Sequence, residues 1–263
     1  TEKGRESLFT DTAGHVRWYW PVAGIQLKDT VYIYFTGVER ATGGLGFAVN
    51  GKDKLVKLKF PEMEVVGYNS LSDFKGINFG VGFINDENNG YVYAFGHKYK
   101  EGGQNDMYVA RFPASRPGQA WESWNGNTWS TDHENALSVR ENAGFTPMVC
   151  KVRDKYVLIN SELSIGCDQG NEIYVSVSDH VTGPFSESKS IHTIDDTVQG
   201  HYPFFYVPVA HPQFINDKDE ILITYNVNGY GTCVEGCTDN RMDPDHYRPR
   251  GIRVPLSLID PEL

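Results

Sequence analysis

The sequence has little positive charge. It contains 24 Lys and Arg against 34 Asp and Glu, which gives a formal net charge of -10. No run of basic residues is longer than two. Proteins that bind nucleic acids carry clusters of Lys and Arg that neutralise phosphates. The shortage therefore excludes a nucleic-acid partner, and we expect a neutral or cationic one.

Long hydrophobic runs are also absent. No segment approaches the roughly 20 apolar residues that a membrane span requires. Residues 1–4, TEKG, do not begin a signal peptide. We therefore expect a soluble chain without membrane contact, in the form of a mature product.

Helical periodicity is missing as well. No stretch places apolar residues at the i, i+3, i+4, i+7 spacing behind a capping residue. The aromatic content of 13% comes mostly from Tyr and Phe, which suit a pleated, half-buried sheet surface. These features predict an all-β protein.

Cysteine is scarce, with 4 residues in the chain. Cys233 and Cys237, with three residues between them, lie in a Gly-rich loop, where a small disulfide ring fits sterically. Cys150 falls on an expected strand, and Cys167 follows its partner strand. One interpretation is one or two disulfides in a secreted or extracytoplasmic protein. The other is buried free thiols with an incidental pair in the loop. Zinc is not expected, because no second ligand pair accompanies the first.

The chain contains four related cassettes, each an apolar strand, an Asp/Asn/Gly turn and a second β-prone strand. Ile25, Phe83, Val149 and Phe214 take equivalent positions at a period of roughly 60 residues, which indicates a repeat architecture. The cassettes are Val22 to Gly37, Val81 to His97, Pro147 to Glu162 and Pro212 to Tyr225.

Each cassette predicts a small antiparallel sheet that cannot bury its faces alone, so the sheets must pack on one another as in a β-propeller. We predict one propeller domain over residues 1–263. Its repeat units lie at about 15–71, 72–130, 135–196 and 200–259. In the last unit, Pro212 to Ile215 is the expected inner strand. Residues Glu6 to Thr10 are expected to form an outer strand of a neighbouring sheet.

The segments NFGVGFINDENNGYVYAFGHK, AHPQF, ILITYNVN, YRPRGIRVPL and SDHVTGPF carry a resemblance to known proteins. From roughly Trp18 to Leu256, the chain resembles five-bladed propellers related to bacterial D-arabinanases and, more distantly, the arabinanase/invertase furanosidases. This resemblance implies a sugar-processing propeller. It also implies a first blade that these residues do not include, so that a second chain supplies it, the sequence is partial, or the blade has been lost.

A propeller brings the starts of inner strands and the ends of second strands to one face around its axis. Carboxylates, amides, histidines and aromatic rings at those places are what a sugar site needs. The strand starts supply Trp18, Trp20, Asn78, Glu141, Asn142, Thr146 and His211, and the strand ends supply Glu39, His97, Glu162, Asn226 and Asn228.

Two carboxylates are the candidates for catalysis. Glu162 ends a β-rich strand with apolar neighbours, and their desolvation would suit a general acid. Glu141 precedes the Asn142-Ala143-Gly144 turn and is the candidate base, with Asp73 as a third carboxylate. The alternatives are a solvated loop glutamate at 162 and a turn or strand-pairing charge at 141.

The remaining candidates bind or pack. His211 resembles the axial histidine of the furanosidase propellers, which helps to hold a central ion or a substrate hydroxyl. His211 and His97 also fit hydrogen-bonded core positions. Trp18 and Trp20 share one side of their strand, where they form a wall of the pocket or pack in the core.

The loop before the last strand is too long for a simple connection, so it is a lid or an interface. Asp239, Asp243 and Asp245 loosely resemble a calcium loop, although the Gly and terminal Glu of an EF-hand are missing. No other cofactor is expected. Arg248 and Arg250 either anchor an anionic or hydroxyl-rich ligand or tie the loop to nearby carboxylates.

Two functions fit these observations. The first is a glycoside-hydrolase-like propeller that acts on a furanose- or pyranose-containing glycan, with Glu162 as acid and Glu141, or a residue of the first blade, as base. The alternative is a non-catalytic carbohydrate-binding or structural propeller that keeps the aromatic and amide lining.

Overall fold

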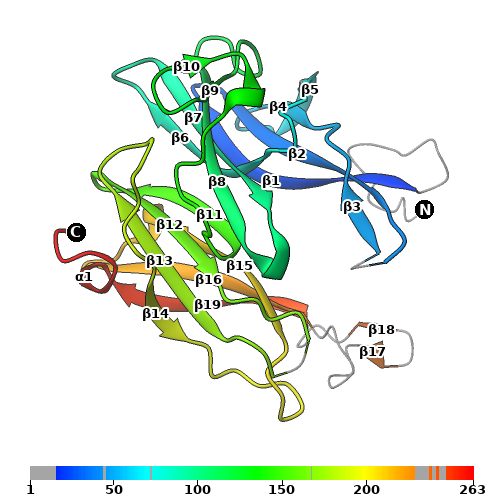
Figure 1. Ribbon diagram of the computed structural model, residues 1–263, viewed down its shortest axis with the longest axis vertical. Coiled ribbons are helices and arrows are strands. Elements are labelled where there is room, and N and C mark those ends of the chain that lie inside the picture. The colour runs from blue at the N-terminus through cyan, green and yellow to red at the C-terminus, as the bar shows by residue number, and fades with distance from the viewer. Residues whose placement is uncertain are drawn as a thin grey trace. The chain divides into compact units, whose positions relative to one another are not determined.

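The computed structural model describes residues 16–263 apart from 44, 45, 72, 167, 229–236, 239–240 and 243–246, and only the backbone of 237–238 and 241–242. Strands dominate this part of the chain (Figure 1). Helix there is confined to short 3-10 turns and the α-helix α1, Leu256–Ile259. None of these described helices is long and apolar enough to cross a membrane. The prediction of an all-β protein is confirmed.

Most strands form four antiparallel sheets, which we call blades 1 to 4 in chain order. Blade 1 contains β1 (Arg17–Leu27), β2 (Thr30–Arg40), β3 (Phe47–Val49), β4 (Lys54–Lys59) and β5 (Glu64–Ser70). Blade 2 contains β6 (Asn78–Asp86), β7 (Tyr91–Tyr99), β8 (Asn105–Pro113), β9 (Glu122–Trp124) and β10 (Trp129–Ser130).

Blade 3 contains β11 (Phe145–Val152), β12 (Lys155–Ser161), β13 (Glu172–Ser178) and β14 (Lys189–Thr193), and blade 4 contains β15 (Phe204–His211), β16 (Glu220–Asn228) and β19 (Tyr247–Pro255). β17 (Cys237–Thr238) and β18 (Arg241–Met242) form a separate pair. Each blade falls inside one predicted repeat unit. The predicted fold class, a β-propeller with four blades in this chain, is confirmed.

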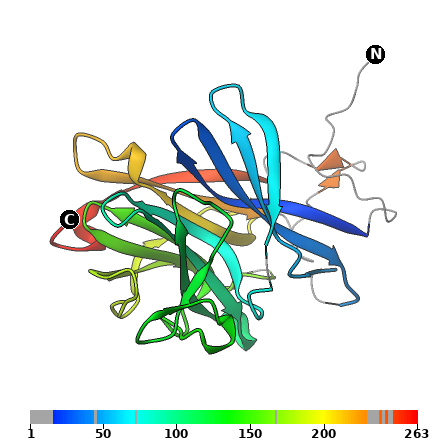
Figure 2. The ribbon, with the colours of Figure 1, turned by 90° about the horizontal axis from the view of Figure 1, so that it is seen from above.

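The chain divides into two compact units. Unit 1 comprises the residues up to Gly96 together with Ala110–Ala136. Its core is aromatic: Tyr34 of β2 contacts Phe83 of β6 at 6.2 Å between ring centroids, and Phe112 packs on Trp121 at 4.6 Å. The contact between Tyr34 and Phe83 joins blade 1 to blade 2. Figure 2 shows the strands of blade 1 in blue to cyan.

Unit 2 comprises His97–Val109 and Leu137–Leu263. Its core is aliphatic and lies between blades 3 and 4, where Val157, Ile159 and Ile173 share one buried cluster with Ile221 and Ile223. Each fully buried side chain of this kind contributes about 1.5–3 kcal/mol relative to its exposed state. The two blades therefore form one stable body.

The first strands of three blades carry a one-residue bulge near their start. The register shifts between Pro21 and Gly24 in β1, between Phe145 and Met148 in β11, and between Tyr206 and Val209 in β15. A bulge reverses the alternation of side chains between the two faces of a sheet. The residues at the strand starts are thus re-aimed relative to the rest of the strand.

The first strand of blade 4 differs from the prediction. Residues Pro212–Phe214 form the 3-10 turn η3, and β15 lies upstream at Phe204–His211. Pro208 within this run is tolerated because β15 is an edge strand of its sheet. The predicted inner strand at Pro212 to Ile215 was therefore wrong.

Candidate functional site

In unit 2, the starts of β11 and β15 lie beside the ends of β12 and β16. Phe145 pairs with Ser161, and Phe204 pairs with Asn228. The rings of Phe145 and Phe204 lie 6.0 Å apart, which brings the two strand starts together. We call this region of blades 3 and 4 the start edge.

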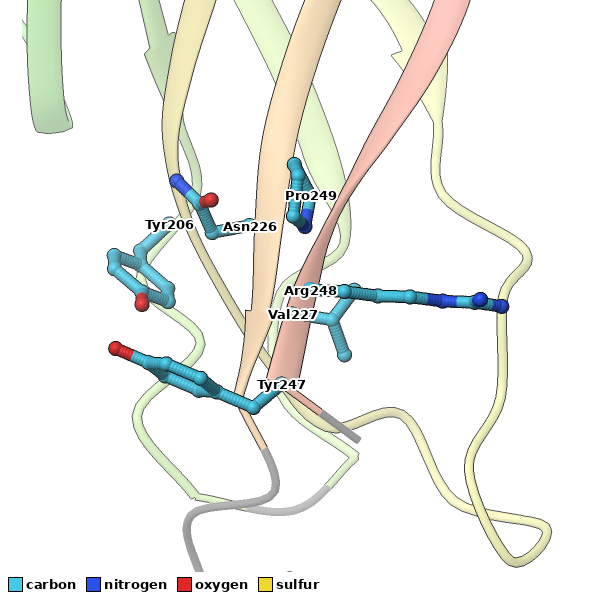
Figure 3. Close-up of a pocket in the computed structure, with 6 residues that line it drawn as sticks. All are labelled: Tyr206, Asn226, Val227, Tyr247, Arg248 and Pro249. Atoms are coloured by element: carbon cyan, nitrogen blue, oxygen red, sulfur yellow. The ribbon is translucent and has the colours of Figure 1, made fainter. Parts of the chain in front are cut away.

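A small open hollow of about 100 Å³ lies on the start edge of blade 4 (Figure 3). The hydroxyl groups of Tyr206 and Tyr247 point toward each other and form a hydrogen bond. The amide of Asn226 lies near Tyr206, whereas the guanidinium of Arg248 points away from both hydroxyls. The hollow is lined by Tyr206, Asn226, Val227, Tyr247, Arg248 and Pro249.

The phenol of Tyr206 is held in its neutral form. Burial, followed by the hydrogen bond with Tyr247, raises the pKa of Tyr206 well above its usual range. Its ring stacks on Phe204, with 4.7 Å between centroids and 18° between planes. A neutral phenol both donates and accepts hydrogen bonds. The hollow therefore offers an aromatic face, phenolic hydroxyls and an amide.

Glu162 follows the last residue of β12 at the start edge of blade 3. Its side chain is exposed, and its Oε2 accepts a hydrogen bond of 3.1 Å from the backbone N–H of Asn171. The expectation that apolar neighbours desolvate this carboxylate was wrong, because the chain leaves the sheet after Ser161. The role of Glu162 as an acid stays a prediction.

Glu141 and Asn142 are exposed on the turn before β11. The backbone N–H of Asn142 donates to Asp106 Oδ1 at 3.0 Å, and its Oδ1 accepts from Lys100 Nζ at 3.2 Å. The Glu141–Asn142 turn is thus anchored to the start of β8. Anchoring is the structural role that Asn142 has here, and a catalytic role for Glu141 stays a prediction.

His97 takes part in the same anchoring. Its Nδ1 lies 2.6 Å from Asn105 Oδ1, and Asn105 Nδ2 donates to the carbonyl of Gly144 at 2.8 Å. Because an amide oxygen only accepts, Nδ1 of His97 donates this bond. Burial lowers the pKa of His97, although the bond to Asn105 raises it. The imidazole is therefore neutral at neutral pH and hydrogen-bonded.

His211 lies away from the start edge. It pairs with Leu222 near the turn of the β15–β16 hairpin, whereas Asn228 pairs with Phe204 at the opposite end. The prediction that His211 and Asn228 face one pocket was wrong, because it rested on the misplaced first strand of blade 4. Nε2 of His211 lies 2.8 Å from the hydroxyl of Thr224, and burial lowers the pKa of His211.

Of its two predicted roles, ligand anchor or tie to a nearby carboxylate, Arg250 has the second. Its Nε lies 3.8 Å from Asp196 Oδ2, and the hydroxyl of Tyr225 donates to the same oxygen at 2.7 Å. Arg250 thus ties β19 to the segment after β14. Of the two arginines, only Arg248 lines the hollow.

Three further candidates belong to unit 1. Trp18 and Trp20 contact each other edge to face at 6.2 Å, and Trp20 contacts Phe47 at 4.6 Å. Asn78 Oδ1 accepts a hydrogen bond of 2.8 Å from the hydroxyl of Thr36. These contacts give each residue a packing or pairing role within unit 1, and their share in a ligand site stays a prediction.

Some predicted features fall outside the described residues. These are Asp239, Asp243 and Asp245 of the suggested calcium loop, Cys167 and Cys233, the side chain of Cys237, and the strand at Glu6 to Thr10. In the part of the chain that the structure describes, no group of three His, Cys, Asp or Glu side chains is arranged to hold a metal ion.

Sequence reasoning missed Tyr206 and Tyr247. Their proximity depends on the register of β15, β16 and β19, which pairs Tyr206 with Asn226 and Asn228 with Tyr247. One signal was present. Pro21, Pro147 and Pro208 each lie in a first strand, and each stands at one of the three register shifts.

Solved structures with the same fold include a protein from Bacteroides ovatus whose assignment as a hydrolase is provisional. The match has 20% identity and a TM-score of 0.68, and it covers 90% of this chain but only 61% of that one. At this identity the likeness shows the fold alone.

Two weaker matches are an endo-arabinase from Bacteroides thetaiotaomicron and the catalytic domain of a GH62 α-L-arabinofuranosidase from Coprinopsis cinerea. The endo-arabinase has 14% identity and a TM-score of 0.47, and the match covers 89% of this chain and 73% of that one. The arabinofuranosidase has 7% identity and a TM-score of 0.46, with 93% of each chain covered.

None of the curated proteins matches the chain. A model of the domain of unknown function DUF5005 matches residues 1–256.

Proposed function

The chain belongs to the DUF5005 family, and we propose that it is a glycoside-hydrolase-like propeller that binds a furanose- or pyranose-containing glycan at the start edge of unit 2. The proposal includes a secreted or extracytoplasmic location, where the protein would encounter such a glycan.

The hollow between Tyr206 and Tyr247 carries this proposal. Sugar rings present apolar CH faces and hydroxyl groups, and binding sites for them combine aromatic surfaces with a few placed polar groups. Tyr206 and Tyr247 supply ring faces and hydroxyls, and Asn226 supplies an amide. Arg248 points away from the hydroxyls, so a neutral sugar suits the hollow better than an anionic one.

Hydrolysis is the catalytic form of the proposal. Glu162 follows Ser161, which pairs with Phe145 at the start edge, and Glu141 lies on the turn before the same strand. Hydrolysis of a glycosidic bond uses two carboxylates on opposite sides of that bond. Their places at the start edge support Glu162 as the acid and Glu141, or a residue outside this chain, as the base.

The non-catalytic form is favoured by the exposure of Glu162 and Glu141. A general acid that works near neutral pH usually needs burial or a charged neighbour to stay protonated. A carbohydrate-binding propeller would keep the tyrosines and the amide without this requirement.

Binding is tested by titration calorimetry with arabinotriose as the furanose probe and xylotriose as the pyranose probe. We expect one of them to bind, and Tyr247→Ala to weaken binding by about threefold to tenfold, the usual worth of an aromatic contact. Tyr99→Ala is the matched control, because Tyr99 is also exposed, at 68%, but does not line the hollow. Equal losses in the two variants would contradict the proposed site.

Catalysis is tested by incubating the protein with the probe that binds and measuring released reducing sugar. Glu162→Gln should abolish hydrolysis and leave binding within about twofold, because the amide keeps its shape but cannot donate the proton. Binding without hydrolysis by the unmodified protein would establish the non-catalytic form.

A further inference from the structure

Two backbone N–H groups on the outer edge of β15 donate hydrogen bonds to hydroxyl side chains of blade 3. Ser164 follows β12, and its Oγ accepts from the N–H of Phe205 at 2.9 Å and donates to the carbonyl of Phe205 at 2.6 Å. Thr146 of β11 accepts from the N–H of Val207 through its Oγ1 at 2.8 Å. The two bonded residues are the neighbours of Tyr206 on either side.

The backbone at this point is strained. Thr146 has a φ of 44° and Val207 a φ of 50°. Both are β-branched, and such residues rarely adopt positive φ. Strained residues persist only where the surrounding structure holds them, and they concentrate at functional sites. The two strained residues are joined directly, because the backbone N–H of Val207 donates a hydrogen bond to the hydroxyl of Thr146.

The strain has a consequence for Tyr206. The bulge between Tyr206 and Val209 sets the direction of the side chains at the start of β15. The ring of Tyr206 is then fixed by stacking on Phe204, and its hydroxyl by the bond to Tyr247. Tyr206 is thus held through its backbone, its ring and its hydroxyl, which is the preorganisation that a binding residue needs.

We propose that Thr146 and Ser164 of blade 3 are positioning residues that hold Tyr206 of blade 4 in its binding orientation. The inference rests on the proposed glycan site for its functional meaning, but the positioning of Tyr206 can be measured without a ligand. Blade 3 then contributes to a site whose ring contacts come from blade 4.

The test uses Thr146→Val and Ser164→Ala, each of which removes one hydroxyl. Thr146→Ser keeps the hydroxyl and should behave as the unmodified protein. Thr224→Val is the matched control, because its hydroxyl bonds His211 at the other end of the β15–β16 hairpin. The protein is labelled with ¹³Cζ-tyrosine, and the signal of Tyr206 is assigned by its loss in Tyr206→Phe.

In Thr146→Val and Ser164→Ala, we expect the Tyr206 phenol to titrate closer to the ordinary value of about 10, because the bond to Tyr247 and the burial both loosen. Hydrogen exchange at the amides of Val207 and Phe205 should accelerate in the corresponding variants. Affinity for the sugar probe should fall about tenfold, as expected when a preorganised contact becomes mobile.

The inference is overturned if the pKa of Tyr206 in Thr146→Val and Ser164→Ala equals its pKa in the unmodified protein. It is also overturned if Thr224→Val shifts the pKa of Tyr206 by the same amount as these two variants. Should Thr146→Val fail to fold, Ser164→Ala decides alone. If the unmodified protein binds neither arabinotriose nor xylotriose, the proposed function fails. The titration then still decides whether the hydroxyls position Tyr206.

Discussion

The hydroxyl of Tyr34 donates a hydrogen bond to Oδ2 of Asp53 in the interior of unit 1. Oδ1 of the same carboxylate accepts from the backbone N–H of Gly37 at 2.9 Å. Tyr34 is completely buried and Asp53 nearly so. Both carboxylate oxygens thus have a donor, which a buried charge requires. Because the ring of Tyr34 also contacts Phe83, this pair stands at the junction of blades 1 and 2.

Tyr34→Phe should lower the free energy of unfolding by about 1–3 kcal/mol, because Asp53 stays buried and loses a donor. The ring packing against Phe83 is preserved. Tyr108→Phe serves as the control, and it should change stability by less than about 0.5 kcal/mol, as most surface substitutions do. Urea denaturation measures both. Equal values for the two variants would show that the Tyr34 hydroxyl contributes nothing.

The carboxylate of Asp53 also makes the free energy of unfolding depend on pH. Burial raises the pKa of Asp53, although the bonds from Tyr34 and Gly37 lower it. The folded protein therefore binds more protons than the unfolded chain from about pH 4, the unfolded value, up to the raised folded pKa. The stabilisation from Asp53 is present below this window and is lost as the pH rises through it.

Asp53→Asn should remove this contribution. The test compares the free energy of unfolding of the two proteins between about pH 3 and pH 6, so that the other carboxylates cancel. The difference, unmodified minus variant, should decline as the pH rises. A difference that increases with pH would mean that the hydrogen bonds outweigh the burial.

Gly144 should tolerate no side chain. A Cβ added there would lie 1.9 Å from Nδ2 of Asn160, which is buried, and φ is 76°. Gly144→Ala should destabilise by about 2–4 kcal/mol, the sum of conformational strain and overpacking. Gly90→Ala is the control, since φ is 70° but nothing lies within 4 Å. It should cost about 1 kcal/mol, and thermal unfolding compares the two.

Cys150 should resist alkylation in the folded protein. Burial raises the pKa of its thiol to about 12, so only about one molecule in ten thousand carries the reactive thiolate at pH 8. Mass spectrometry of the peptide that contains Cys150, after brief exposure to iodoacetamide, measures this directly. Denaturant should make the same peptide react fully. Rapid labelling without denaturant would show that the thiol is accessible.

Much of the fold could be predicted because strand and turn chemistry is local. The predicted cassettes Val22 to Gly37, Val81 to His97 and Pro147 to Glu162 coincide with the strand pairs β1–β2, β6–β7 and β11–β12. Their alternation of apolar and polar residues and their turn residues are visible in a short window. Repetition at a period of roughly 60 residues then indicated the number of sheets.

The first strand of blade 4 was predicted at the wrong place because it breaks the local rules. Pro208 lies inside β15, and Val207 adopts a conformation that β-branched residues avoid. The apolar run after Pro212 offered a better local match to a strand, but it forms η3. The bonds from Thr146 and Ser164 that hold β15 come from another blade, so no window of the sequence contains them.

Of the residues that line the hollow, some could be named from the sequence and others could not. Asn226 and Arg248 line the hollow as ligand-binding candidates, since their places near the ends of strands can be read from the sequence. Tyr206 and Tyr247 depend on the register between distant strands. Exposure of Glu162 depends on the path of the chain beyond β12, which strand patterns do not determine.

The pairing of Asn228 with Tyr247 has a consequence for protein engineering. These residues are the last of β16 and the first of β19, and they lie opposite each other in an antiparallel ladder. A two-residue Asn-Gly turn has the length and twist to join such positions. A shortened chain that replaces residues 229–246 by this turn should keep blade 4 intact. The difference in affinity for the sugar probes between the shortened chain and the full chain would then measure how much the excised residues contribute to binding.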